Sequence, residues 1–154
     1  MSRKRCRRRV YALVNPIAHA ISGAAITPSA DLDRLRLLEL SAIESFAKGQ
    51  ATREDWKALA DLVNLTEVMS IQFGIAPEAA HAAEEAQAAL LRSYERAKEG
   101  KPLLMDGPGL VALRECYAWH DGQRSSVARS VYERAIKATS DRVRSAAPAV
   151  KVLG

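Results

Sequence analysis

Residues 52–69 read TREDWKALADLVNLTEVM, and this stretch holds both the start signal and the buried face of one helix. Thr52 and Asp55 have the spacing of a capping box, in which each side chain bonds to the other residue's backbone N–H. The stretch predicts a helix that begins after Thr52 and ends near Phe73, because Gly74 follows. Its apolar positions recur at a helical spacing, and we expect them to face the core: Trp56, Leu59, Leu62, Val63 and Met69.

The segments on either side of this stretch have the same kind of pattern. Pro28 and two aspartates open a helix that Gly49 ends, with Leu32, Leu35, Leu38, Ile43 and Phe46 as its predicted buried side. Pro77 opens a third helix, which ends before Gly100. Its inner face consists largely of small residues, which permit close helix packing: Ala79, Ala83, Ala86, Leu90, Tyr94 and Ala97.

A fourth long helix is predicted from about residue 108 to 144, after the turn DGPG at 106–109. Asp106 suits the N-cap of this helix, and Pro108 suits its first turn. Gly122 lies inside the pattern and costs about 1 kcal/mol relative to alanine. A kink or a split at HDGQRSS, residues 120–126, is the alternative. The inward positions are Leu113, Tyr117, His120, Val127 and Val131.

No segment alternates with a period of two, so the predicted class is all-α. We expect an antiparallel bundle of about four main helices, preceded by a short helix in PIAHAISGAAI at 16–26. The expected organisation is a basic arm over 1–15, one helical domain over 16–147 and a tail over 148–154. At 154 residues the chain has the size of one domain and needs no metal or disulfide to hold a core.

Charge is unevenly distributed along the chain. Residues 3–9 carry six Lys or Arg and no acid, residues 10–123 carry 10 basic and 16 acidic residues, and residues 124–151 carry 7 basic and 2 acidic residues. An acidic body therefore lies between two basic ends, a layout suited to phosphate or an acidic protein. The candidate binding residues are Arg3, Lys4, Arg5, Arg7, Arg8, Arg9, Arg124, Arg129, Arg134, Lys137, Arg142 and Arg144.

The first 26 residues resemble an export signal only superficially. The basic start and the pair Arg8–Arg9 fit such a signal, but Asn15 and Pro16 divide the apolar run after five residues. Cys6 and Cys116 form no CxxC pair, which disfavours a disulfide framework and a zinc ribbon. We expect a cytoplasmic protein.

Catalytic chemistry has one weak candidate in the sequence. Cys116 and His120 share a helical face, and a Cys–His pair can form a thiolate nucleophile. No oxyanion loop or orienting partner accompanies them, so a structural role is the preferred interpretation. The turn at 106–109 lacks a phosphate-loop signature, and Asp106 brings negative charge to it. The three histidines have no metal-ligand spacing. We therefore expect no enzyme activity, no metal and no cofactor.

Several stretches resemble a loose family of short helical proteins encoded on prophages and conjugative plasmids of proteobacteria. They are the basic start followed by NP, GQATREDWKALADLVN at 49–64, AQAAL at 86–90 and DGPGLVALRECYAWHDGQ at 106–123. The resemblance implies a mobile-element setting, in which small proteins commonly regulate expression or block host defences, as anti-CRISPR proteins do. It supplies no catalytic residue.

Two binding functions fit these observations. The first is a non-enzymatic inhibitor or adaptor that docks on host nucleic-acid-handling machinery, most specifically an anti-CRISPR type inhibitor of a CRISPR effector complex. The alternative is a DNA-binding transcriptional regulator that uses the basic arm and the basic last helix. The partner is thus a host protein or ribonucleoprotein, or DNA or RNA, and no membrane is involved.

Overall fold

The structure is a computed structural model, and it describes residues 29–145 of the chain. This part is all-helical, as predicted, and contains five helices and no strand: α2 (Ser29–Ala47), α3 (Arg53–Ile71), α4 (Ala79–Lys98), α5 (Gly107–Ser126) and α6 (Arg129–Ser145). The predicted basic arm, the short helix at 16–26 and the C-terminal tail lie outside the described residues.

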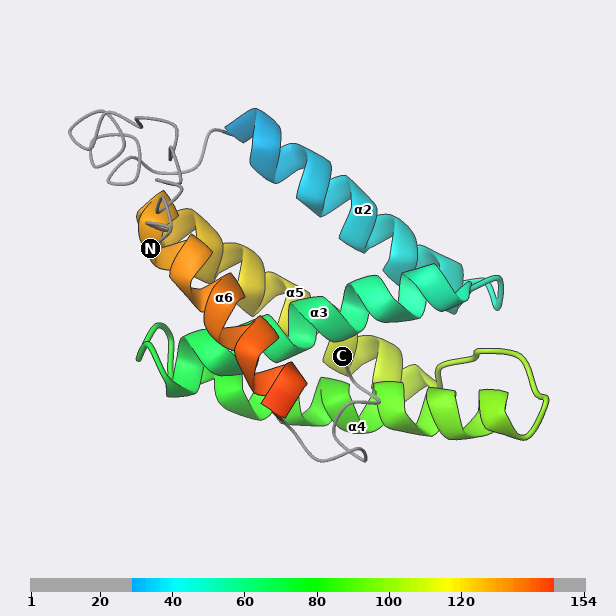
Figure 1. Cartoon of the computed structure of the whole chain (residues 1–154). Coiled ribbons are helices and arrows are strands. Elements are labelled where there is room, and N and C mark those ends of the chain that lie inside the picture. The colour runs from blue at the N-terminus through cyan, green and yellow to red at the C-terminus, as the bar shows by residue number, and fades with distance from the viewer. Residues whose placement is uncertain (1–28, 146–154) are drawn as a thin grey trace, which may run out of the picture.

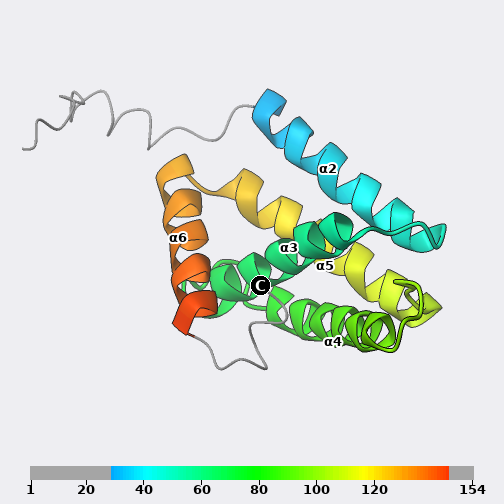
Figure 2. The same cartoon turned by 45° about the vertical axis from the view of Figure 1, so that its right-hand side comes forward.

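Helix α3 is the central element of the fold. It packs against α2, α4, α5 and α6, while α4 and α5 pack closely against each other. Figures 1 and 2 show each helix folding back after a short connection, with α2 and α6 splayed apart on opposite sides of α3. Because α3 must meet four neighbours, apolar positions surround much of it and ten of its residues are buried.

One main core joins α2, α3, α4 and α5. Alanines supply the α4 side of this core, so the backbone of α4 approaches its neighbours closely. Trp56 adds a polar anchor, because its indole Nε1–H donates to the Leu90 carbonyl at 3.0 Å. The buried members are Ala42, Ile43, Phe46, Trp56, Leu59, Ala60, Leu62, Val63, Ala82, Ala83, Ala86, Leu90, Leu113 and Cys116.

The helix ends form where the sequence signals them. Thr52 Oγ1 accepts from Asp55 N at 3.2 Å, and Asp55 Oδ2 accepts from Thr52 N at 2.8 Å, which completes the predicted capping box. Gly49 and Gly74 follow α2 and α3 with φ values of 67° and 65°. These left-handed conformations are readily available to glycine, and they let the chain turn sharply into the next connection.

The predicted continuous helix over 108–144 is wrong. The alternative, a split into two helices, is correct, although the break lies just after the predicted stretch 120–126. The chain stays helical through Gly122 to Ser126, and it breaks at Val127, which is extended with φ −115° and ψ 156°. An unbroken helix of this length would extend about 55 Å, beyond the body of the molecule. The break instead lets α6 fold back and bury Tyr132 and Ala135 in a second cluster on α3.

The predicted inner face of α2 also needs a correction. Leu32, Ile43 and Phe46 are buried, but Leu35 is only half-buried and Leu38 is 59% exposed. Glu39 occupies the inward position that periodicity would give to an apolar residue, and it is 8% exposed. The reason is a buried cation on α5, described below.

Candidate functional site

The outward face of α6 presents most of the cations that were predicted for the last helix. Arg129, Lys137 and Arg144 have side chains that are 47%, 79% and 75% exposed, and Arg134 is exposed beside them. Tyr132 and Ala135 take the opposite face of the helix and fix it on α3. We call Arg129, Arg134, Lys137 and Arg144 the basic face of α6.

Each cation of the basic face already has a local contact. Arg129 pairs with Glu133 at 2.9 Å, and Lys137 pairs with Asp141 at 3.2 Å. Arg144 shares Asp141 at 3.4 Å, and the Arg134 guanidinium lies 5.9 Å from the centre of the Phe73 ring. Exposed ion pairs of this kind contribute at most about 1 kcal/mol, so an incoming phosphate or carboxylate can replace the acidic partners.

Arg142 differs from the basic face because it points toward the body. Its Nη1 donates to Glu67 Oε2 at 2.8 Å, and the same carboxylate oxygen accepts from Gln87 Nε2 at 2.9 Å. These contacts link α6 to α3 and α4. Arg142 therefore helps to hold α6 against the body of the protein, although 42% of its side chain remains exposed.

Arg124 was predicted as a binding residue for nucleic acid or an acidic partner, but its position in the structure does not fit that role. Its side chain is fully buried. Nη1 and Nη2 donate to the two carboxylate oxygens of Glu39 at 2.8 and 2.7 Å, and Nε donates to Asp121 at 3.0 Å. A buried guanidinium keeps its charge only with such partners. Arg124 is therefore an internal tie between α5 and α2, out of reach of a phosphate on the surface.

The ion pairs around Arg124 extend to the molecular surface. Arg36 of α2 donates through Nε to Asp121 at 2.8 Å, so two helices share this carboxylate. Partial burial raises the pKa of Asp121, but hydrogen bonds from Arg36 and Arg124 outweigh it and lower that pKa below its ordinary value. Burial raises the pKa of Glu39, while the hydrogen bonds from Arg124 act in the opposite direction.

Cys116 and His120 lie on the same helix, but neither has the ionisation of a catalytic dyad. Burial raises the pKa of the Cys116 thiol to about 12, so it is protonated at neutral pH. Complete burial and the nearby Arg124 charge lower the pKa of His120 to about 3. His120 Nε2 instead lies 3.2 Å from the Tyr132 hydroxyl, which joins α5 to α6. These groups support the structural interpretation.

Gln123 is a buried polar residue that the sequence patterns did not single out. Its Nε2 donates to Ser70 Oγ and to the Ile75 carbonyl, both at 2.9 Å. It thereby ties α5 to the end of α3 and to the connection before α4. The one feature of the sequence that could have indicated its burial is its position three residues after His120, on the same side of the helix.

The turn at 106–109 is a helix cap, as predicted. Asp106 Oδ1 accepts from the Gly109 backbone N–H at 2.7 Å, so the aspartate carboxylate takes the place at which an anion would bind. Arg92 lies 3.5 Å from the same carboxylate. The geometry therefore supports a structural role for this turn.

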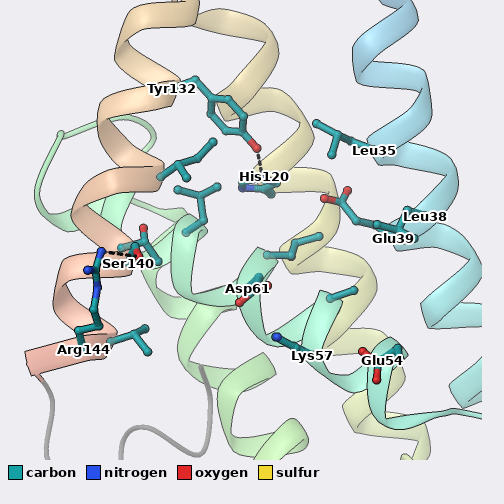
Figure 3. Close-up of a pocket in the computed structure, with 16 residues that line it drawn as sticks. Leu35, Leu38, Glu39, Glu54, Lys57, Asp61, His120, Tyr132, Ser140 and Arg144 are labelled. Carbon is teal, nitrogen blue, oxygen red and sulfur yellow. Dashed lines mark hydrogen bonds between the residues drawn. The ribbon is translucent and has the colours of Figure 1, made fainter. Parts of the chain in front are cut away.

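An open groove of about 680 Å³ lies between α2 and α6, with α3 as its floor. Figure 3 shows Leu35 and Leu38 on the α2 side, Tyr132 and Ser140 on the α6 side, and Lys57 and Asp61 between them. The apolar lining comes from three helices and includes Leu35, Leu38, Leu62, Leu65, Ile136 and Val143. The sequence predicted helices but not this groove, because the break at Val127 decides where α6 lies.

The remaining predicted site residues, Arg3, Lys4, Arg5, Arg7, Arg8 and Arg9, lie outside residues 29–145. Within that range, no three His, Cys, Asp or Glu side chains are grouped as a metal site would need. Over the same range, no helix combines the length and apolar character needed to span a bilayer. Comparisons of the chain with protein-family models, curated proteins and solved structures gave no match.

Proposed function

We propose that the protein is a non-enzymatic accessory protein that binds host nucleic-acid-handling machinery. The observation that carries this proposal is the basic face of α6. Helix α6 contains five basic and two acidic residues, and all of its cations except Arg142 lie on the side turned away from α3. A cationic helix face of this kind suits a phosphate backbone or an acidic protein surface.

The charge of the other helices limits where such a partner binds. Helices α2 and α3 each contain four acidic and two basic residues, whereas α4 and α5 are balanced. A polyanion is therefore attracted to the basic face of α6 and repelled by the acidic residues of α2 and α3. This difference orients the partner before contact, which raises the association rate more than the final affinity.

The most specific form of the proposal is an anti-CRISPR type inhibitor of a CRISPR effector complex. Its supports are the resemblance to mobile-element proteins and the fit between a basic face and a ribonucleoprotein. The test is phage or plasmid interference in cells that express the protein, together with co-purification of the effector. Full interference at saturating expression would eliminate this form.

Variants of the basic face, compared with a control variant, test whether this face is the binding surface in the interference assay. Lys137→Glu combined with Arg144→Glu should remove inhibition and co-purification. Lys48→Glu is the control, because Lys48, just after the end of α2, is a similarly exposed lysine in an i,i+4 pair with Glu44 and is far from α6 in the sequence. Equal inhibition by the α6 variant and the control would exclude the basic face as the binding surface.

The alternative function, a DNA-binding transcriptional regulator, uses the same face. If Arg129, Arg134, Lys137 and Arg144 all contact phosphates, the logarithm of affinity should fall with the logarithm of salt concentration with a slope of about −3 to −4. Pull-downs with and without nuclease then separate the two functions. A protein partner retained after nuclease treatment favours the inhibitor, while binding lost with the nucleic acid favours the regulator.

A further inference from the structure

The groove between α2 and α6 leaves apolar side chains open on both walls. Leu38 of α2 is 59% exposed and Ile136 of α6 is 46% exposed, and both line this groove. Figure 3 shows α2 and α6 on the two sides of the groove, with Lys57 and Asp61 of α3 between them. Exposed apolar side chains gathered in one groove mark a surface that another segment, protein or ligand can cover. We propose that residues 10–27 of the same chain lie in this groove.

The composition of that segment fits the walls. Residues 10–30 form the longest stretch of the chain without Asp, Glu, Lys or Arg, and twelve of the eighteen residues in 10–27 are apolar. Leu13, Ile17 and Ile21 recur at intervals of four. An uncharged segment brings no charge of its own into the groove, and its apolar side chains leave water when they contact the apolar walls.

The attachment point of the segment also fits. The segment joins the chain just before Ser29, the first residue of α2, and Leu35 of the groove wall lies only two turns further along that helix. Figures 1 and 2 both show the first turns of α2 and α6 at the same end of the molecule. Such a short connection gives the segment a high effective concentration at the groove.

The length of the segment matches the groove. On α6 the lining residues run from Tyr132 to Arg144, which spans about 18 Å of helix. The short helix that the sequence predicts, eleven residues from Pro16 to Ile26, would span a similar length of about 16 Å.

Disulfide trapping in the full chain tests the proposal. In a Cys6→Ser background, Ile136→Cys is combined in turn with Ile17→Cys, Ile21→Cys or Ala24→Cys, and Cys116 remains because it is buried. The matched control replaces Ile136→Cys by Leu37→Cys, on α2 and 69% exposed but outside the groove lining. Circular dichroism checks that each variant keeps its helix content.

The expected result is an intrachain disulfide to position 136 in at least one pair. It appears as a faster monomer on a non-reducing gel, is mapped by peptide mass spectrometry, and forms at least tenfold faster than with position 37. Disulfides found only in covalent dimers would overturn the proposal and assign the groove to a second copy. Rates equal to those of the control in all three pairs would overturn it as well.

An environment-sensitive dye gives a second readout that needs no cysteine. In the full chain, Ile17→Asp combined with Ile21→Asp should expel the segment and raise the fluorescence of an apolar dye severalfold. Adding Ile136→Asp should remove most of that rise, because the dye then loses the groove wall. Unchanged fluorescence in the Ile17→Asp/Ile21→Asp variant would contradict occupancy of the groove by this segment.

Discussion

Arg124 and Glu39, 85 residues apart in the sequence, form a two-point ion pair inside the protein, with N–O distances of 2.8 and 2.7 Å. The pair joins α5 to α2 and turns a glutamate into a core residue. Charges in the interior are costly unless both partners are present, so the pair defines how these two helices are aligned.

Removal of one member of this pair should be strongly destabilising. Arg124→Met leaves the Glu39 carboxylate buried without its partner, and we expect the free energy of unfolding to fall by about 3–5 kcal/mol. The double variant Glu39→Leu/Arg124→Met should recover most of this loss. Urea unfolding followed by circular dichroism measures both. A loss below about 1 kcal/mol in Arg124→Met would show that the pair contributes little.

His120 should make stability depend on pH between neutrality and mild acid. Its pKa in the folded protein is about 3, below the ordinary value of 6.5, so the unfolded chain binds a proton that the folded protein excludes. Above pH 6.5 the residue has no effect, and below it we expect a loss of about 1.4 kcal/mol per pH unit until about pH 3.

The pH effect is isolated by comparing variants. His120→Gln should flatten the curve of unfolding free energy between pH 6.5 and 5, while His81→Gln, at an exposed position of α4, should leave it unchanged. Carboxylates titrate mainly at lower pH and affect all three proteins alike. Parallel curves for wild type and His120→Gln would show that His120 does not cause the pH dependence of stability.

The cap at the start of α5 should make two neighbouring glycines respond differently. A Cβ at Gly109 would lie 2.6 Å from Asp106 Oδ1 and 2.7 Å from Met105 Cγ, so Gly109→Ala displaces the capping carboxylate. We expect a loss of about 1–2 kcal/mol in urea unfolding. A Cβ at Gly107 meets nothing within 4 Å, so Gly107→Ala should change stability by less than about 0.5 kcal/mol. Equal effects would show that the cap does not depend on this close approach.

Replacement of Gly122 by alanine should increase the stability of the protein. It lies inside α5, it is exposed, and a Cβ there meets no atom within 4 Å. Gly122→Ala should therefore stabilise the protein by about 0.5–1 kcal/mol, because alanine loses less backbone entropy in a helix. Thermal unfolding measures the gain, and a drop in melting temperature would indicate that α5 bends at this residue.

The basic face of α6 should contribute to binding more than to folding. Lys137→Ala breaks an exposed pair with Asp141, and we expect it to change the unfolding free energy by less than about 1 kcal/mol. Binding to the partner should weaken, and more at low salt than at high salt. Lys48→Ala, which breaks the corresponding exposed pair with Glu44, should leave binding intact. Equal weakening by both variants would point to a loss of general charge.

Local signals allowed most helices to be predicted. The Thr52–Asp55 box, the cap at Asp106 and the glycines after α2, α3 and α4 all act within a few residues, so their effect is readable from the sequence. The concentration of basic residues near the end of the chain was also readable from the sequence. Most of these side chains are exposed in the structure because α6 has few buried residues.

Tertiary packing decided the rest. The sequence alone determined the all-helical class, most helix starts and ends, and the charge of the last helix, since each depends on residues that are close together in the chain. Only the packed structure decided that Arg124 is buried against Glu39, that the chain breaks at Val127, and that a groove opens between α2 and α6. The physical reason is that burial and pairing depend on residues far apart in the sequence, which meet only after the helices have packed.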